Sequence, residues 1–473
     1  MGNDRATAAG GRGFARHRLP PQAKGWPLVG PLPSLASDLF GFLTDARAEH
    51  GDVYRLNLGG QKFVVLNHPR HAEHVMLSRS ANYIKEGPMW RVFRQLVGKG
   101  IATSEGQLWR RQRRMIQPQF HLKKVAALTD QIVSAIDESL DGWDEAVSSK
   151  RPIDAERALL RMTMKVILRT MFGTGINEAE SDRVAEAFTF ALDFILRGMV
   201  FSLLPKWLPA PGQRRYRESI QIIHGTIDKV IADRQRHRVD SDDFIQMLLD
   251  AVDTEDGKGM SNEQLRDEAV TLFLGGYETS AVVLSWTLHL LERHPEVAAR
   301  LCEEVDTVLG ERTPTFDDLR SLSYSRQVLQ ETMRLIPPIW WLTRAAVDDD
   351  TIDGFHIPAG TSVILLPYTI HHHPEHWPES TVFDPDRFSA ERSADRHRQA
   401  FMPFGTGQRM CIGREFALME GQLILARILQ RYRLPKTTVA APSFSTRDLR
   451  VSSAIKRKGG IFIELAHRAR DSP

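Results

Sequence analysis

Residues 404–413 read FGTGQRMCIG, and this stretch decides how the rest of the chain is interpreted. Its glycines permit a tight turn with backbone angles that other residues resist. Cys411 lies between that turn and a helix that we expect to begin at about Ile412. Free N–H groups and the positive end of the helix dipole favour a thiolate at such a position. A thiolate held this way can serve as an axial ligand to iron, but considered alone the loop favours the simpler alternative, a buried cysteine at a helix start.

A long helix is predicted upstream of this loop, over roughly Asn262 to His294. Ser261 and Gln264 have the spacing of a capping box at its start. At 1.5 Å per residue the helix would span about 50 Å, enough to cross the whole body. Gly275 and Gly276 stand near its middle, where each glycine costs about 1 kcal/mol relative to alanine. A flat ligand against the backbone, or a close helix crossing, would offset that cost.

Two shorter patterns pair residues on one helical face. Glu331 and Arg334 are three residues apart, and Trp109 and Arg113 are four apart. Taken alone, such pairs say little, because exposed ion pairs of this kind stabilise a helix only slightly.

Together these patterns resemble the cytochrome P450 family. The haem-binding loop of that family, F-x-x-G-x-R-x-C-x-G, is matched at every fixed position, by Phe404, Gly407, Arg409, Cys411 and Gly413. The resemblance covers nearly the whole chain, and it is to bacterial, soluble members that look similar to microsomal ones. It implies a mainly α fold with a smaller β region, in which haem lies between the long central helix and the helix after the cysteine loop.

The resemblance also implies a set of cofactor-binding residues. Cys411 would be the axial ligand of the iron of heme b (iron protoporphyrin IX). Arginines suit the propionates because arginine–carboxylate pairs are charge-assisted and geometrically specific. The expected set is Cys411, Trp109, Arg113, Arg344, Arg409, Phe404, Gly405, Gly413, Gly275 and Gly276. A buried network of Glu331, Arg334 and Arg387 is implied as well, with a role in folding and haem retention.

The central helix of the family carries an acid followed by a threonine, which here are Glu278 and Thr279. Oxygen activation needs protons in a dry pocket, and a hydroxyl beside a carboxylate can relay them. We expect these two residues to be catalytic. The alternative is that Thr279 bonds only to a carbonyl of its own helix.

The expected substrate pocket is apolar and aromatic, which suits a terpenoid, a steroid or a fatty acid. Any single one of its residues could instead belong to the ordinary core. By analogy with the family, the pocket would include Trp90, Phe190, Phe194, Phe201, Leu274, Ile339, Trp340 and Trp341. Residues 198–212 are predicted to form a mobile lid.

A run of cations surrounds the Trp109 helix. Such a run is usually a solvated face. The functional alternative is a docking patch for an acidic electron donor, steered by charge. The run comprises Arg110, Arg111, Arg114, Lys123 and Lys124.

Composition narrows the remaining possibilities. The formal net charge of +3 does not suggest nucleic-acid binding. Two cysteines, Cys302 and Cys411, make a disulfide framework implausible and fit a cytoplasmic location. Since no apolar stretch reaches the length of a membrane span, we expect no transmembrane segment.

The chain is expected to hold one catalytic domain. Residues 1–19 are predicted to be a flexible tail, and residues 20–473 the domain itself. Short strands are expected at Val53 to Leu58 and Lys62 to Leu66, and a hairpin near Gly459 is expected to close the chain.

The function that follows is a monooxygenase of class EC 1.14, which inserts one atom of O2 into a lipophilic molecule by hydroxylation or epoxidation. No flavin or iron–sulfur domain fits in the remaining residues, so a separate ferredoxin and its NADPH- or NADH-driven reductase are the expected partners. The alternatives are an isomerase or dehydratase on the same fold, a peroxide-driven hydroxylase and, least favoured, a non-catalytic haem sensor.

Overall fold

The structure is a computed structural model, and it describes residues 18–25, 30–58, 61–173, 178–202, 211–237, 243–435, 445–451 and 454–468. Three expectations lie wholly or partly outside these ranges: the tail over residues 1–17, the Phe201 side chain and most of the expected lid. Arg18, inside the range expected for the tail, packs over the ring of Phe355 at 4.8 Å, and its backbone carbonyl accepts a hydrogen bond from the His356 N–H.

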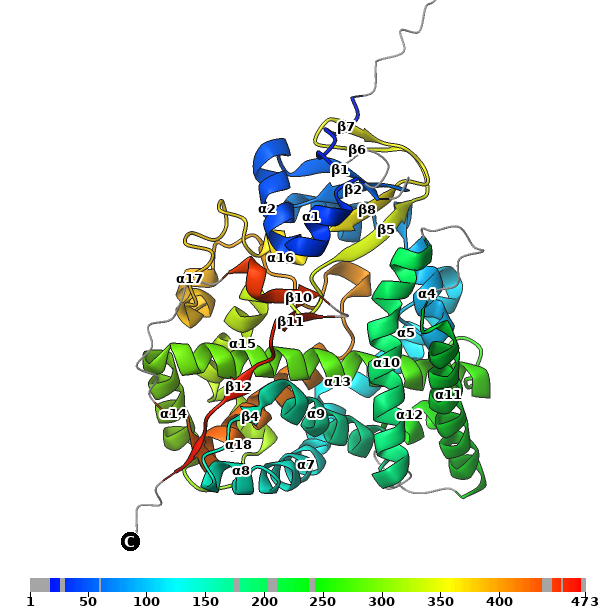
Figure 1. Cartoon of the computed structure of the whole chain (residues 1–473). Helices are drawn as coiled ribbons and strands as arrows, with labels where there is room; N and C mark the ends of the chain where they lie inside the picture. The colour runs from blue at the N-terminus through cyan, green and yellow to red at the C-terminus, as the bar shows by residue number, and fades with distance from the viewer. Residues whose placement is uncertain are drawn as a thin grey trace, which may run out of the picture.

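The smaller part of the molecule is built on a five-stranded sheet, drawn at the top of Figure 1. The strand order is β1 (Val53–Leu58), β2 (Gln61–Leu66), β8 (Ser362–Leu365), β5 (Leu342–Ala346) and β3 (Tyr83–Ile84). Only β2 and β8 pair in parallel, with Val64 opposite Val363; the other neighbours are antiparallel. The two strands predicted at the start of the chain are therefore confirmed, and they pair with each other. Helices α1 (Leu32–Ser37) and α2 (Leu39–His50) lie beside the sheet, and β6 (Asp350–Ile352) pairs with β7 (Phe355–Ile357).

The larger part is helical and is organised around α13 (Asn262–Arg293), which crosses it from side to side (Figure 1). The Gln264 N–H donates to the Ser261 hydroxyl at 3.2 Å, so the predicted cap and helix are confirmed. Most residues of α13 are buried on all sides, as expected for a helix packed within the core. Its main neighbours are α9 (Ala155–Phe172), α11 (Gln213–Arg236), α15 (Ser323–Leu335) and α18 (Arg414–Arg431).

The other described helices lie around this centre or beside the sheet. They are α3 (Pro69–Glu73), α4 (Pro88–Val97), α5 (Gly106–Ile116), α6 (Leu122–Ala127), α7 (Thr129–Asp141), α8 (Asp144–Ser148), α10 (Glu178–Ser202), α12 (Phe244–Asp250), α14 (Pro295–Leu309), α16 (Pro367–Ile370) and α17 (Ala390–Ser393). The first part of the expected lid belongs to α10, which is helical as far as Ser202. Among the described helices, none has both the length and the apolar character that a membrane crossing requires.

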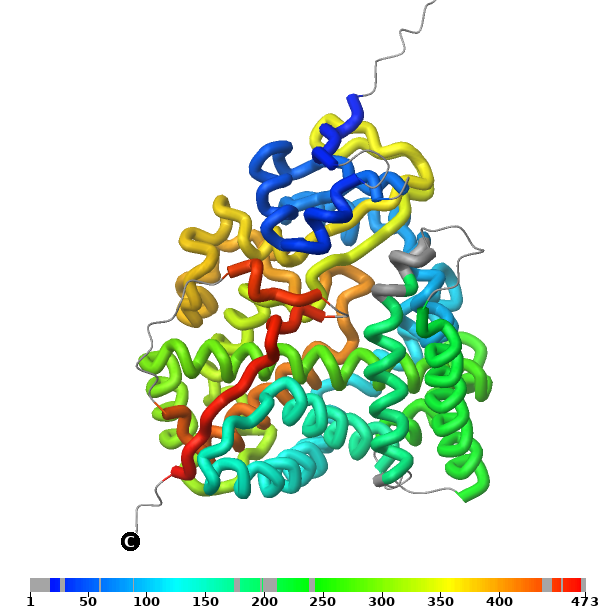
Figure 2. Tube along the Cα trace, in the orientation of Figure 1, coloured from blue at the N-terminus to red at the C-terminus, as the bar shows by residue number. Residues whose placement is uncertain are grey.

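The C-terminal segment differs from its prediction. No hairpin forms about Gly459: β11 (Ile455–Arg457) pairs backward with β10 (Leu449–Val451), and β12 (Phe462–Ile463) pairs with β4 (Ile153–Asp154). The reason is tertiary, since this segment runs along α13 and α9 (red in Figure 2) and takes its partners there. A last pair joins β13 (Ala466–His467) to β9 (Tyr432–Arg433).

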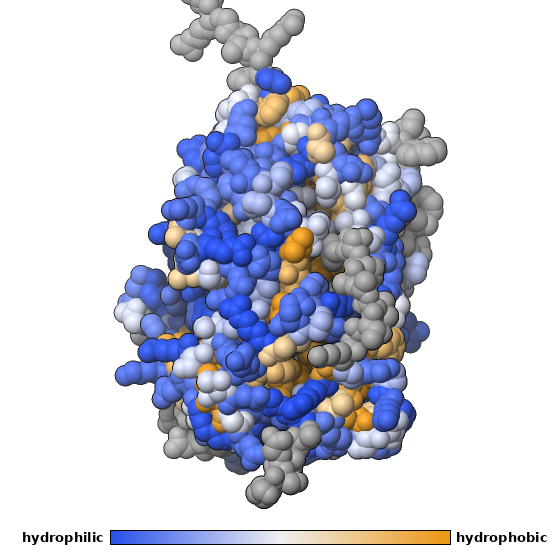
Figure 3. All heavy atoms as spheres, turned by 90° about the vertical axis from the view of Figure 1, so that its left-hand side faces the viewer, coloured by the Kyte–Doolittle hydropathy of each residue, from blue (hydrophilic) through white to orange (hydrophobic). Residues whose placement is uncertain are grey.

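The face in Figure 3 is mostly polar, with small apolar patches between hydrophilic ones.

Candidate active site

The cysteine loop is a tight turn closed by backbone hydrogen bonds. The Cys411 N–H donates to the Phe404 carbonyl at 2.9 Å, across the turn. Gly405 and Gly407 have φ of 69° and 71°, where a side chain would be strained. At Gly407 an added Cβ would also lie 2.2 Å from the Met76 carbonyl oxygen. The glycines therefore fix the loop shape, as the sequence suggested.

The setting of the thiol differs from the expected one. Helix α18 begins at Arg414 with Gly413 as its N-cap, so Cys411 lies outside the first turn. The thiol is accessible to water-sized molecules yet surrounded by protein, as a group facing an internal hollow would be. Burial raises the pKa of the Cys411 thiol, against the opposing effects of a Gly413 backbone hydrogen bond and of Arg113 and Arg414. The predicted lowering by the helix is thus outweighed; a bound metal ion would deprotonate the thiol outright.

A cavity lies between the cysteine loop and the central helix. Its lining is almost wholly apolar. One wall comes from α13, one from α15, and one from the loop and α18. The lining residues are Thr279, Ser280, Val283, Leu284, Leu329, Met333, Pro338, Phe404, Ala417, Leu418 and Gly421. The cavity therefore joins the neighbourhood of Cys411 to that of Thr279.

The two glycines of α13 have different reasons to be glycine. Gly275 is exposed although its neighbour Leu274 is buried, and a Cβ at Gly275 would meet no atom within 4 Å. It therefore presents bare backbone to an open space. At Gly276 an added Cβ would lie 2.6 Å from the Cδ1 atom of Ile167 on α9. The close approach at Gly276 is thus a helix crossing, the alternative offered above for its glycine.

The acid and the alcohol of α13 point in different directions. The Thr279 hydroxyl lines the cavity and donates to the Gly275 carbonyl at 2.7 Å. This is the local bond of the simpler alternative, but it leaves the hydroxyl lone pairs as acceptors. The Glu278 carboxylate instead forms an ion pair with Lys456 on β11, with Oε1 and Nζ 2.9 Å apart. Sequence reasoning missed Lys456, which no motif marks.

Sequence reasoning also missed Lys85, which joins the three predicted arginines in a cluster of buried and half-buried cations. The pKa of Lys85 is lowered, and burial is the largest cause. The nearby charges of Arg344, Arg409 and Arg113 lower it further. Burial likewise lowers the pKa of Arg409 and Arg113, and that of Arg344 to about 10. Within the described part of the chain, Glu105 is the carboxylate that acts on this cluster.

These contacts fit the propionates of a haem. Four cations around one carboxylate leave positive charge that an anionic group could pair, because buried positive charge is costly until it is paired. Arg409 donates to the Ser104 carbonyl at 2.9 Å and to Glu105, while Lys85 donates to the Ala102 carbonyl at 2.6 Å. The structure pairs Trp109 with Arg409, whose guanidinium lies 3.9 Å from the ring centre. Arg113 instead reaches the Met410 carbonyl, at 3.1 Å, beside the cysteine.

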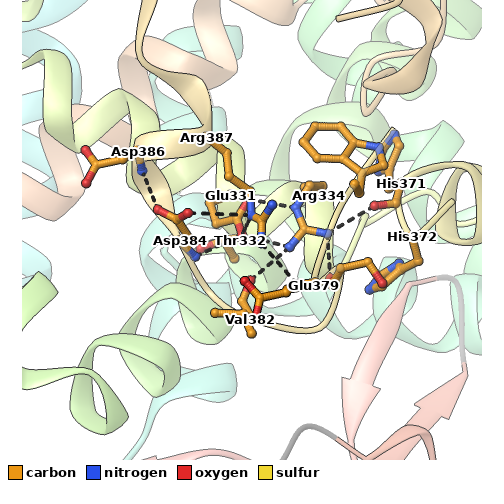
Figure 4. Close-up of polar contacts among 12 residues, drawn as sticks. Glu331, Thr332, Arg334, His371, His372, Glu379, Val382, Asp384, Asp386 and Arg387 are labelled. Atoms are coloured by element: carbon orange, nitrogen blue, oxygen red, sulfur yellow. Dashed lines mark hydrogen bonds and ion pairs between the residues drawn. The ribbon is translucent and has the colours of Figure 1, made fainter. Parts of the chain in front are cut away.

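The Glu331–Arg334–Arg387 contacts are present, and they lie on α15 and the irregular stretch beside it (Figure 4). Arg334 donates to both Glu331 oxygens at 2.7 Å, and Arg387 Nε lies 3.5 Å from Glu331 Oε1. Arg334 also donates to the backbone carbonyls of His371, Ser380 and Val382. Burial raises the pKa of Glu331 against the opposing effect of Arg334. One arginine therefore ties a stretch that has little secondary structure to α15.

The expected pocket residues that the structure describes lie in separate places, and none of them lines the cavity described above. Phe190 and Phe194 stack on α10, and Phe194 stacks on Tyr216 of α11 at 4.5 Å. Trp340 and Trp341 stack on each other at 5.0 Å, next to Ile339, which is exposed. Trp90 is half-buried on α4, and Leu274 is buried on α13.

The basic run is partly neutralised. Arg111 and Arg114 both reach Asp253, at 3.2 and 2.8 Å. Two of the five expected docking cations therefore hold the segment after α12 in place, and Arg110, Lys123 and Lys124 remain as the exposed part of the patch.

A histidine cluster elsewhere has the spacing of a metal site but the wrong protonation. One ligand atom each of His68, His373 and Glu375 lie within 4.8 Å of one another. However, His68 Nδ1 accepts from the Arg70 N–H and His373 Nδ1 from the Glu375 N–H. A neutral ring whose Nδ1 accepts must carry its proton on Nε2, which then donates to a carboxylate. We therefore assign these rings to backbone capping.

Comparisons with known proteins agree with this geometry. The sequence model of the cytochrome P450 family matches residues 20–458. The chain is 36% identical over 417 residues to cyclooctat-9-en-7-ol 5-monooxygenase of Streptomyces melanosporofaciens, covering 87% of this chain and 89% of that protein. It is 33% identical to pentalenene oxygenase of Streptomyces avermitilis, over 86% and 89% of the two chains.

A third relative and a solved structure extend the likeness. Cyclooctatin synthase of Streptomyces melanosporofaciens is 32% identical, over 89% of this chain and 90% of that protein. The crystal structure of the cytochrome P450DA heme domain superimposes with a TM-score of 0.85 at 26% identity, covering 96% and 98% of the two chains.

Proposed function

Because the chain belongs to the cytochrome P450 family and is therefore a haem-thiolate monooxygenase that uses O2, we propose that it hydroxylates or epoxidises a terpenoid. The proposal is supported by relatives named for cyclooctat-9-en-7-ol, pentalenene and cyclooctatin. The observation that carries the oxygenase part of the proposal is the apolar cavity bounded by Thr279 on one side and by Phe404 and Ala417 on the other, where the cofactor would lie. We take residues 20–473 as one catalytic domain.

In this proposal the cofactor is heme b, held by Cys411 as the iron ligand. Lys85, Arg113, Arg344 and Arg409 would bind its propionates. The bound haem supplies O2 binding and transfer of one oxygen atom, which the thiolate favours by donating electron density. Gly275 would let the backbone of α13 approach the cofactor, since it has no side chain to obstruct it.

The residues of α13 would supply and direct protons. Thr279 holds its hydroxyl at the cavity wall, where its lone pairs can accept a hydrogen bond and pass on a proton. Glu278, the next residue toward the N-terminus, would restore that proton. The apolar side chains around Thr279 would limit the water in the cavity, so that protons would arrive through the residues of α13.

The substrate would be a terpenoid because an apolar cavity gives affinity by area, with few polar contacts to satisfy. The aromatic groups on α10 and around Trp340 are the proposed pocket walls. Electrons would come from a ferredoxin and its NADPH- or NADH-driven reductase, docked against Arg110, Lys123 and Lys124. We place the enzyme in the cytoplasm.

A binding screen followed by turnover tests this function. The haem-loaded protein is titrated with a cyclic terpene, a terpene alcohol, a steroid and a fatty acid, and the haem absorbance is followed. The proposal predicts a spectral shift with a terpenoid, and an oxygenated product when ferredoxin, reductase and NADPH are added. A response to fatty acid or steroid alone would contradict the substrate class, and product from peroxide without O2 would favour a peroxide-driven hydroxylase.

A further inference from the structure

We propose that Asp267 and Glu268, in the first turns of α13, are positioning residues for the cofactor. Both carboxyl groups hold the backbone of residues 98–105, the α4–α5 loop between those two helices. This loop in turn binds Lys85 and Arg409, two of the four cations assigned to the propionates. The proposal rests on that assignment, and it adds two residues of α13 that act through the loop.

The α4–α5 loop is bonded to α13 through its backbone. The Lys99 N–H donates to Asp267 at 2.7 Å, and the Ile101 N–H donates to Glu268 at 2.8 Å. Both acceptor residues are buried, and Glu268 has no exposed surface. Because an N–H group left without a partner inside a protein is costly, the two carboxyl groups determine where the loop backbone lies.

Two glycines allow the loop to come this close to the helix. At Gly98, whose φ is 55°, an added Cβ would lie 2.1 Å from Oδ2 of Asp267. At Gly100 an added Cβ would lie 2.1 Å from the Thr271 hydroxyl oxygen. The sequence therefore supplies glycine where the loop approaches α13, and an acid where the loop backbone needs an acceptor.

The same loop carries the carbonyl groups that bind two of the cations. Lys85 donates to the Ala102 carbonyl at 2.6 Å, and Arg409 donates to the Ser104 carbonyl at 2.9 Å. Because Ala102 directly follows a residue held by α13, the direction of its carbonyl depends on that bond. The two acids of α13 therefore act on the cations through the loop backbone.

Further hydrogen bonds make the loop one unit. The buried Gln112 side chain on α5 donates to the Lys99 carbonyl at 2.7 Å and accepts from the Ser104 hydroxyl. Glu105, the last residue of the loop, pairs with Arg409. A displacement of the loop where it meets α13 would thus be passed on to its contacts with the cations.

Such a unit would favour cofactor binding by holding the cations in place beforehand. Ordering a flexible, charged side chain when an anion binds reduces the affinity. The carbonyl groups of the loop remove much of that cost, because they fix the Lys85 ammonium and the Arg409 guanidinium before the propionates arrive. Supporting residues of this kind typically change affinity by about 10- to 100-fold when they are altered.

The test compares Glu268→Met with Glu268→Gln in the haem-loaded protein. Burial raises the pKa of Glu268 to about 8, so at pH 7 the group is mainly a neutral acid, and glutamine keeps its shape and its acceptor oxygen. Methionine has a similar volume but offers the Ile101 N–H no oxygen. We expect haem to transfer to an acceptor protein about tenfold faster from E268M than from wild type. E268Q should match wild type.

A double variant separates positioning from a general loss of stability. If Glu268 acts through the loop, haem transfer from Lys85→Met combined with E268M should be accelerated by less than the product of the two single factors. Independent effects would multiply. Asp144→Ala is the stability control: it removes an acceptor of Tyr432 and Arg431 on α8, far from α4 in Figure 1, and should leave the transfer rate unchanged.

Hydrogen exchange follows the loop itself in the same haem-loaded proteins. The amide groups of residues 98–105 should exchange slowly in wild type and E268Q, and faster in E268M. Asp267→Ala is the second variant, which leaves the bond at Ile101 in place if E268M does not fold. It should accelerate both the exchange of the Lys99 amide and the transfer of haem.

The outcomes distinguish the proposal from the propionate assignment beneath it. If K85M loses haem faster while E268M and D267A match wild type, the role of the two acids is refuted and the propionate site stands. The role is also refuted if E268Q loses haem as fast as E268M, or if the factors of the double variant multiply. If K85M retains haem like wild type, the propionate assignment of Lys85 is wrong, and the proposal falls with it.

Discussion

At the scale of single residues, the hydroxyl of Thr279 is the group whose removal should separate electron consumption from product formation. Thr279→Ala removes the acceptor at the cavity wall. We expect product formation to fall by about 100-fold, the lower range for a lost general acid, with a smaller loss in NADPH consumption and more peroxide released. Thr271→Ala is the matched control, because Thr271 makes the same bond to a carbonyl four residues earlier on α13. Equal losses in both variants would mean a structural effect.

Lys85 makes a second residue-scale prediction, about haem retention. Lys85→Met removes one of four cations that surround a single carboxylate. If these cations bind propionates, haem should transfer to an acceptor protein about tenfold faster from K85M, a loss of roughly 1.4 kcal/mol in binding. The exposed Lys62→Met on β2 should transfer haem at the wild-type rate. An unchanged rate in K85M would remove Lys85 from the propionate site.

At the scale of elements, the Glu331–Arg334 pair decides whether the irregular stretch stays on α15. Both side chains are fully buried, so Glu331→Gln leaves an uncompensated guanidinium. We expect a loss of about 3–5 kcal/mol in unfolding free energy, as for other broken buried pairs. The exposed pair of Arg214 and Glu218 offers the contrast: Glu218→Gln should cost less than about 1 kcal/mol. Urea unfolding of both variants measures the difference, and similar losses would count against the anchoring role.

Local features of these elements could be predicted from the sequence, whereas contacts between segments far apart in the chain could not. The cap at Ser261, the hairpin of β1 and β2 and the spacing of Glu331 and Arg334 are local, so a short window of sequence predicts them. Lys456 and Glu278 are 178 residues apart in the chain, and the sequence near either residue gives no sign that the two form an ion pair. The same holds for Ile167 against Gly276, and for the strand after Gly459, which takes its partner from β4.

At the scale of the whole molecule, burial of histidines sets the acid limit of stability. Burial lowers the pKa of His371 and His372 from 6.5 to about 3 and that of His289 to about 4. The unfolded chain then binds more protons than the folded one below pH 6.5, so stability is present above that pH and is lost as pH falls. Each group contributes up to about 1.4 kcal/mol per pH unit within its window.

Buried glutamates lower the stability of the folded protein as the pH rises. Burial raises the pKa of Glu268 and Glu420 from 4.5 to about 8. The folded chain holds these protons where the unfolded chain has lost them, so their contribution is present at low pH and declines from pH 4.5 up to pH 8. Denaturant unfolding should therefore show greatest stability in mildly acidic solution. Relative to wild type, Glu420→Gln should gain stability between pH 5 and 8, by roughly 1.4 kcal/mol per unit; a constant difference across that range would contradict this assignment.

The bond between Cys411 and iron is the central claim, and the absorption spectrum of the reduced, carbon-monoxide-treated protein tests it most directly. Wild type and Cys302→Ala, which alters the half-buried cysteine of α14, should both give the maximum typical of sulfur-ligated haem iron. Cys411→Ala should lose that maximum. A wild-type spectrum without it, or an unchanged spectrum after removal of Cys411, would contradict the account.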